Sequence, residues 1–448
     1  MDKTLLNNLL ESKNFSALTE KLEQVHPADI AEFLKDLDSE NQAEILKLLD
    51  ANKAGEALSE LDSEDREELL DKISSDELTR LVESLPADDT TDILSESPEE
   101  TTEEVLTNLK PQDSAEIEEL LTYDEDSASG IMDPELLAVP ETWTVGQTLD
   151  AIKAIETDEP IYYVYAVDYQ NRLVGFISLQ KLIREDNSRP IGSVMDKQFV
   201  TVKKDTDQEE VAHIVQKYDL MAIPVVDENG CLCGRITADD IIDVIEEETT
   251  EDFFRLAGAF RWSEETHSLF KTALQRLPWL VIALVGSLIG VSFQIFFKPK
   301  IGISWFEVFV PFVIVIAAMG GNVGIQSCTT LVRGMATGDI DENVSKAIFR
   351  EIIVSIIVGV ACALIAATYV HLRGVANPWL ISSVVGVSLF SSIILSASVG
   401  ALAPATCKKI GIDPTVASGP FVTVTLDILG IIIYFTIAIL FLKIAGYA

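Results

Sequence analysis

The 448-residue sequence holds 72 acidic and 33 basic residues, giving a formal net charge of −39, although 48% of its residues are hydrophobic. Sixty-five of the acidic residues precede residue 277, and this much negative charge argues against nucleic acid as a partner. The five scattered cysteines imply no disulfide framework, and the N-terminus lacks the basic start and apolar core of a signal peptide, so we expect the acidic part in the cytoplasm.

A sequence repeat occupies the first part of the chain. Its copies begin at Leu37, Leu61, Leu85 and Leu109, 24 residues apart, and each combines a turn or cap signal, an acidic first turn and apolar residues at helical spacing. Such units bury their apolar faces by stacking on one another. We therefore expect residues 1–129 to form an all-α superhelical domain. Its many acids are typical of a solvated surface, and binding of divalent cations by some of them stays open.

The next region, residues 130–245, changes to short strands alternating with helices, and the pattern occurs twice. The segments AIPVVD at 222–227 and GRITADD at 234–240 resemble the motifs of CBS domains, which are α/β modules that bind adenosine compounds. The resemblance implies that Thr237 and Asp240 hold a ribose, as of ATP. The alternative is that Thr237 caps the next helix and Asp240 lies in its first turn. The first copy has Ser178 and Lys181 instead, so we expect at most one nucleotide site.

An amphipathic connecting, or plug, helix is expected over residues 238–270, followed by a five-helix transmembrane domain over residues 271–448. The apolar spans cover residues 277–297, 306–332, 352–370, 379–403 and 421–442. With the N-terminus in the cytoplasm, nine basic residues lie near the inner membrane surface and four near the outer surface, in agreement with the positive-inside rule. The C-terminus is then outside.

A single carboxylate, Asp427, lies in the middle of the last apolar span, which has no other charge. An Asp at the centre of a membrane helix costs about 2.5–3.5 kcal/mol even on mild insertion scales, so such residues usually face a water-filled path. We interpret Asp427 as part of a cation site. A protonated Asp427, or one that hydrogen-bonds a neighbouring helix, is the alternative.

The second span contains the segment MGGNVGIQSCTT, whose glycines allow close helix approach and whose polar side chains offer oxygen atoms. This segment fits a pore lining, although tight helix packing alone would also explain it. Glycines stand at Gly320, Gly321 and Gly324, with Asn322 and Gln326 among the polar residues.

Together, these features resemble the MgtE family of magnesium channels over nearly the whole chain. The resemblance implies a homodimeric, magnesium-selective channel in the cytoplasmic membrane of a bacterium, which closes when cytosolic Mg²⁺ is high. It assigns the selectivity carboxylate to Asp427. The implied pore-lining residues are Gly321, Asn322, Gly324, Gln326, Pro420 and Thr423. Two positions depart from the family pattern. Ile325 stands where the family often has Asn, and Gly419, before Pro420, stands where some members have Asn.

The same resemblance implies cytosolic magnesium sensors, at Asp240, Asp243, Glu248, Glu251, Asp252 and Asp413. Asp240 is thus assigned both to a metal and to a ribose. We expect no enzymatic activity, because the four histidines are scattered and none forms an HExxH zinc motif. A CBS-regulated transporter that couples divalent cations to sodium or protons is the alternative function.

Overall fold

The computed structural model describes residues 3–155, 160–257, 269–336, 340, 343–373, 375, 377–412, 414–417 and 419–447. It separates into two compact units, the first ending at Glu247 and the second holding most of the chain from Glu248 onward. We describe each unit by itself. The predicted fold class is confirmed: an all-α domain and an α/β pair make up the first unit, and apolar helices make up the second.

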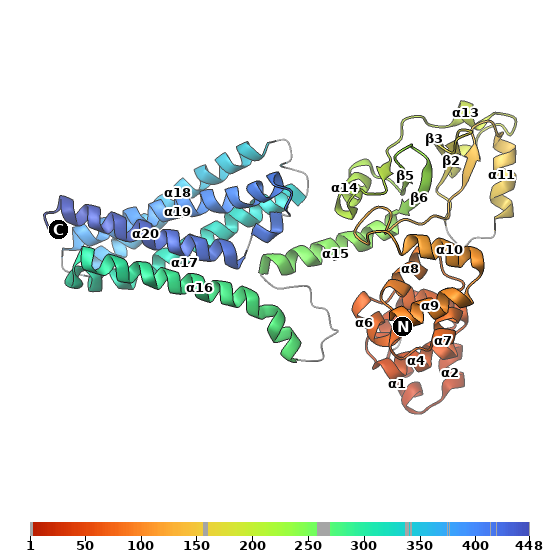
Figure 1. Ribbon diagram of the computed structural model, residues 1–448, viewed down its shortest axis with the longest axis horizontal. Helices are drawn as coiled ribbons and strands as arrows, with labels where there is room; N and C mark the ends of the chain where they lie inside the picture. The colour runs from red at the N-terminus through yellow and green to blue at the C-terminus, as the bar shows by residue number, and fades with distance from the viewer. Residues whose placement is uncertain are drawn as a thin grey trace. The chain divides into compact units, whose positions relative to one another are not determined.

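Ten helices form the N-terminal part of the described chain (Figure 1). Helices α3 to α10 begin at residues 27, 39, 51, 63, 75, 87, 99 and 111, an even spacing of 12 residues, so the 24-residue sequence repeat is a helix pair. The bounds are α1 Lys3–Glu11, α2 Phe15–Leu22, α3 Pro27–Leu34, α4 Ser39–Leu48, α5 Ala51–Ser59, α6 Ser63–Leu70, α7 Ser75–Val82, α8 Ala87–Ser95, α9 Glu99–Asn108 and α10 Pro111–Leu120.

The helices stack in two rows. Helix α3 packs on α5, α5 on α7 and α7 on α9, while α4 packs on α6 and α8 on α10. Leucines at the same place in successive helices, such as Leu34, Leu46 and Leu58, are at most 1% exposed and form the core between the rows. Burial of such side chains contributes about 1.5–3 kcal/mol each.

Polar side chains connect several helices to the end of the preceding one. Gln42 donates to the carbonyl of Leu34 at 2.9 Å, and Thr102 donates to the carbonyl of Leu94 at 3.0 Å. The last carbonyls of a helix have no partner within it, so these side chains satisfy groups that would otherwise be buried unpaired. The contacts fix the turn between successive helices.

The α/β part holds two three-stranded sheets, each with one parallel and one antiparallel pair. The first consists of β1 Ala138–Pro140, β2 Tyr163–Val167 and β3 Leu173–Ser178, with helices α11 Val145–Ala154, α12 Leu179–Leu182 and α13 Ile191–Val194. The second consists of β4 Val202–Lys203, β5 Ala222–Val226 and β6 Leu232–Thr237, with α14 Gln208–Tyr218 and the first turns of α15 Ala238–Ala257. The connecting helix α15 therefore begins at the residue directly after strand β6 of the second CBS module. Its predicted continuation over residues 258–268 lies outside the described residues.

Five helices of the second unit are long and apolar enough to cross a membrane, within the part of the chain that the structure describes. They are α16 Leu269–Ile301, α17 Ile303–Ala336, α18 Val344–Leu372, α19 Pro378–Lys409 and α20 Pro420–Ile444, with a short 3-10 helix, η1 Pro414–Ala417, before the last. Helix α19 is central, since it packs against α17, α18 and α20. The outer helices expose side chains such as Leu284 and Leu364, as a lipid-facing surface requires.

One buried ion pair stabilises the helical stack. Arg66 on α6 donates through Nε and Nη2 to the two carboxylate oxygens of Glu96, which follows α8, at 2.5 and 2.7 Å. The two side chains are only 11% and 13% exposed. A bidentate pair of this kind restrains α6 and α8, which lie one 24-residue repeat apart in the sequence.

We expect Arg66→Met to open this part of the stack, because it leaves Glu96 charged, buried and unpaired at a cost of about 3–5 kcal/mol. Amide hydrogen exchange in α6 and α8 should then speed up by about a hundredfold or more. The double variant Arg66→Met/Glu96→Leu should largely restore protection. Lys35→Met, which breaks an exposed pair with Asp62, serves as the control and should change exchange little. Unchanged exchange in Arg66→Met would contradict a stabilising role for the pair.

Candidate functional site

Carboxylates from distant parts of the sequence gather in the first unit. Asp88 lies in the first turn of α8, Asp133 precedes β1, and Asp240 lies in the first turn of α15. Asp88 is close enough to both Asp133 and Asp240 to feel their charges, and Asp92 feels the charge of Asp240. The helical domain and the second CBS module therefore face each other with like charges.

Burial changes the chemistry of these acids. One oxygen of Asp88, Oδ1, is fully buried with no hydrogen-bond partner, and desolvation together with the charge of Asp133 raises the pKa of Asp88 well above its usual value. Desolvation by the surrounding protein raises the pKa of Asp92 to about 7, although its side chain still reaches solvent. Asp243 is also exposed, yet desolvation and then the charges of Asp240 and Glu60 raise its pKa to about 6.

These acids suit a divalent cation because their negative charge is only partly compensated. The charge of Arg66 acts on Asp92, and Arg235 on β6 donates to Asp133 Oδ2 at 2.9 Å. Among the described residues, no group of three or more His, Cys, Asp or Glu side chains is already arranged to hold a metal. Oxygen ligands in this number fit Mg²⁺, which keeps several of its own waters and needs few protein ligands. A hydrated ion bridging two carboxylates is therefore what this cluster can accept.

The pair Thr237 and Asp240 forms one half of a capping box, the half in which the side chain of the third helical residue accepts from the residue before the helix. The backbone N–H and the hydroxyl of Thr237 both donate to Asp240 Oδ2, at 2.9 and 2.6 Å. The other carboxylate oxygen of Asp240, Oδ1, takes no part in this contact. In the first CBS copy, Ser178 caps α12 by accepting from the backbone of Lys181, whose ammonium pairs with Asp196 at 2.7 Å.

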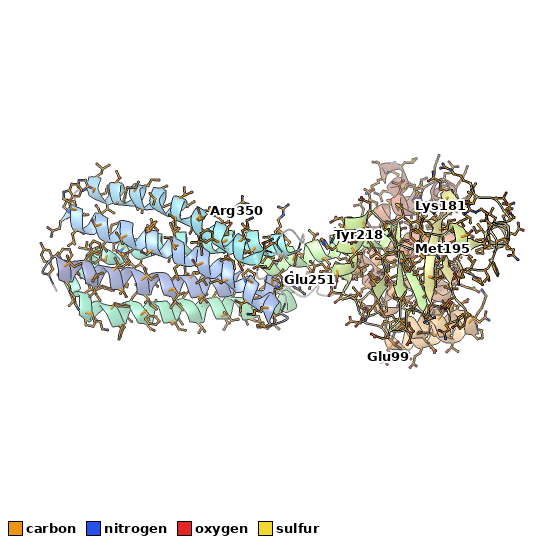
Figure 2. The ribbon with its side chains drawn as sticks, turned by 90° about the horizontal axis from the view of Figure 1, so that it is seen from above. Glu99, Lys181, Met195, Tyr218, Glu251 and Arg350 are labelled. Carbon is orange, nitrogen blue, oxygen red and sulfur yellow. The ribbon has the colours of Figure 1, made fainter. Side chains whose placement is uncertain are left out.

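The other sensor residues implied by the resemblance have different surroundings. Asp243 belongs to the carboxylate cluster, whereas Glu251 on α15, labelled in Figure 2, forms an ion pair with Arg255 one turn later. Glu248 and Asp252 are half-buried on the same helix, and each interacts with another group. Asp413 lies outside the described residues.

The second unit holds Asp427 within the helix bundle. Asp427 lies on α20 and is half-buried, and in the described chain no side chain hydrogen-bonds to it. Gly321 of α17 lies beside it: a β-carbon there would lie 3.9 Å from Asp427 Oδ1 and 3.5 Å from Thr423 Cγ2. Thr423 itself donates to the carbonyl of Gly419 at 3.0 Å. Pro420 begins α20, but its side chain lies outside the described part.

The glycine-rich segment of α17 divides between two roles. Asn322 and Gln326, four residues apart, lie exposed on one face of the helix. Gly324 is buried on another face, where a β-carbon would lie 1.9 Å from Leu426 Cδ1, and its carbonyl lies against Gly400. Gly324 thus serves tight helix packing, which was the alternative interpretation of this segment, while Gly321 borders Asp427.

Sequence reasoning missed Asp88, Asp92 and Asp133. Their only signal was the acidic first turn of each repeat, and the repeat has many such acids. The acids of α8 and α10 lie close to charged groups of the α/β part, and the sequence pattern does not reveal this proximity.

Comparisons with known proteins match three parts of the chain to the same family. The model of the MgtE family, described as divalent cation transporter, matches residues 313–437. The MgtE intracellular N domain matches residues 25–126, and the CBS domain matches residues 128–188 and 191–247. These matches fall on the part of the second unit from α17 to α20, on the helical stack and on the two α/β modules.

Relatives of known name share this organisation. The chain is 37% identical to the magnesium transporter MgtE of Thermus thermophilus over 341 residues, covering 75% of this chain and 74% of the relative. It is 34% identical to the transporter of the same name from Enterococcus faecalis, covering 74% and 73%. A solved structure, the cytosolic domain of the Mg²⁺ channel MgtE in complex with ATP, is 38% identical with a TM-score of 0.52, covering 54% of this chain and 99% of that one. The chain therefore belongs to the MgtE family of magnesium transporters.

Proposed function

We propose that this protein is a magnesium channel of the cytoplasmic membrane of a bacterium, with its N-terminus in the cytoplasm and its C-terminus outside. The observation that carries the proposal is Asp427: a half-buried carboxylate without a hydrogen-bonding side chain among the described residues, on an apolar helix, beside Gly321. A charge in this position is expensive unless a cation or water compensates it. The magnesium transporters named above are similar to the chain over three quarters of its length.

The pore is proposed to form between two copies of the chain. Asn322 and Gln326 are polar and exposed on a membrane helix, where lipid would leave their amides unsatisfied. A homodimer with a twofold axis along this face would cover both residues and bring two Asp427 carboxylates to one path. Two carboxylates and nearby dipoles suit hydrated Mg²⁺, which gives up its water reluctantly.

The carboxylate cluster of the first unit is proposed to sense cytosolic Mg²⁺. Without the ion, Asp88 and Asp92 on α8 repel Asp240 on α15, and Glu60 of the helical domain repels Asp243 on the same helix. A bridging Mg²⁺ converts this repulsion into attraction and holds the helical domain against α15. Because α15 continues along the chain toward α16, restraining it provides a route to closing the pore.

An adenine nucleotide is proposed as a second ligand, at Thr237 and Asp240. The support is the ATP in the solved relative and the free second oxygen of Asp240. Since Asp240 also belongs to the carboxylate cluster, nucleotide and Mg²⁺ binding are expected to influence each other.

The test of the channel proposal is Asp427→Asn. The amide keeps the shape of the side chain and removes its charge, so Mg²⁺ uptake into a magnesium-depleted host should fall to background while the protein still inserts. Glu307→Gln, which removes an exposed carboxylate from α17, is the control and should retain uptake. Normal uptake by Asp427→Asn would exclude the pore assignment. A dependence of uptake on a sodium or proton gradient would instead favour the coupled transporter.

The sensor proposal predicts a pH dependence with a definite sign. Mg²⁺ binds the ionised carboxylates, and protons compete for them below the raised pKa values of about 7 for Asp92 and about 6 for Asp243. The cytosolic Mg²⁺ concentration that half-closes the channel should therefore rise as cytosolic pH falls from 8 to 5.5. The variant Asp88→Asn/Asp243→Asn should need more Mg²⁺ at every pH, whereas exposed Asp150→Asn should behave as wild type. Patch recordings at stepped Mg²⁺ measure both, and an unchanged closure curve in the double variant would remove these residues as sensors.

The nucleotide proposal is tested by calorimetry with ATP on the purified chain. Thr237→Ala should weaken binding at least tenfold, because it removes a hydroxyl that a ribose contacts, while Thr237→Ser should retain it. Absence of heat with any adenine nucleotide in the wild-type protein would leave the helix cap as the role of this pair.

A further inference from the structure

Helix α20 alone determines where the Asp427 carboxylate lies. Since no described side chain hydrogen-bonds to Asp427, its position follows from the rotation and height of the helix that carries it. A site that handles an ion must hold its ligands to within about 0.5 Å. The contacts that fix α20 are therefore part of the ion site even where they touch no ion.

Two branched side chains beside Asp427 fill notches left by glycines of neighbouring helices. Val424 Cγ1 lies 1.8 Å from the place where Gly286 of α16 would carry a β-carbon, and Leu426 Cδ1 lies 1.9 Å from the corresponding place at Gly324 of α17. Both distances are far below any real carbon–carbon contact. Each glycine is thus required by the side chain that occupies its notch.

The two notches hold α20 from different sides. At about 100° per residue, Asp427 points roughly 60° away from Val424 and roughly 100° away from Leu426, between the two contacts. On the next turn, Ile431 Cδ1 lies 3.1 Å from the β-carbon place of Gly290, and Ser392 Oγ of α19 lies 3.3 Å from that of Gly430. Contacts from three helices therefore leave α20 little freedom to rotate.

The Leu426 notch is the more rigid of the two. Leu426 is 1% exposed, whereas the α16 helix opposite Val424 is largely lipid-facing. The backbone of Gly324 also packs closely on α19, because a β-carbon on Gly400 of that helix would lie 2.3 Å from the Gly324 carbonyl oxygen. Gly324 and Leu426 are therefore both enclosed by neighbouring atoms. A change at this contact is therefore passed to α20.

We propose that Leu426 is a positioning residue for the magnesium site: seated in the Gly324 notch, it sets the rotation of α20 and so the distance of Asp427 from Gly321 and from the permeating ion. This inference rests on the proposed role of Asp427 in the pore. It assigns to Gly324 the role of receiving Leu426, in place of lining the path. Selectivity for Mg²⁺ then depends on an apolar contact that never meets the ion.

The experiment, in the full-length protein, adds one carbon atom at Gly324 and then removes one from Leu426 on the other side of the contact. Gly324→Ala adds a methyl to the notch and should lower Mg²⁺ flux per folded protein about tenfold, with a loss of preference for Mg²⁺ over Na⁺ measured from reversal potentials. Adding Leu426→Val to Gly324→Ala removes a methylene opposite the new methyl and should restore flux and preference to within about twofold. Leu440→Val makes the same change on an exposed part of α20 and should have no effect.

Each result decides the proposal. The positioning role is wrong if Gly324→Ala keeps its preference for Mg²⁺, or if adding Leu426→Val fails to restore a lost preference. A packing role alone would change the amount and the melting temperature of the protein but not its selectivity. If Gly324→Ala does not fold, Leu426→Val alone must reduce Mg²⁺ preference for the proposal to stand, since it leaves the notch partly empty. Asp427→Asn separates the two levels: normal Mg²⁺ uptake there refutes the channel proposal itself, whereas background uptake there with a normal Gly324→Ala refutes only the positioning role.

Discussion

The cost of holding carboxylates away from water governs both units of this protein. In the second unit Asp427 bears that cost within an apolar helix, and in the first unit Asp88, Asp92 and Asp243 bear it at a crowded protein surface. In neither place does a basic side chain neutralise the charge fully. The same ion, Mg²⁺, is the natural compensation in both places, so a transported ion and a regulatory ion meet similar chemistry.

The two sites differ in how firmly their carboxylates are held. Around Asp427, glycines admit branched side chains from α20 and leave the helix little freedom. Around Asp88, the acids come from separately folded parts, and in the described chain they form no ready-made metal cage. A rigid site suits selection of one ion from many, whereas a deformable site suits a sensor, whose occupancy must change the conformation.

The sequence was sufficient wherever the signal was local. The membrane spans followed from apolar runs, Asp427 from its isolation within one of them, and the helix pairs from evenly spaced leucines. It was insufficient where a residue's role depends on a distant partner. Nothing near Asp88 distinguishes it from the other acids of the repeat, and nothing near Gly324 reveals that Leu426, about a hundred residues later, fills its notch. Thr237 and Asp240 lie between these cases, because the motif locates the pair but serves a cap and a ribose equally well.

The 12-residue spacing of the N-terminal helices has a consequence for how this domain can change in length. Helices alternate between two rows, so loss or gain of one helix would move every later helix into the opposite row. The acidic turn of α8 would then face away from α15. Loss or gain of two consecutive helices keeps each remaining helix in its row, so insertions and deletions compatible with the domain come in units of 24 residues. The repeat visible in the sequence is therefore the smallest piece that the domain can lose or gain without changing which face it presents.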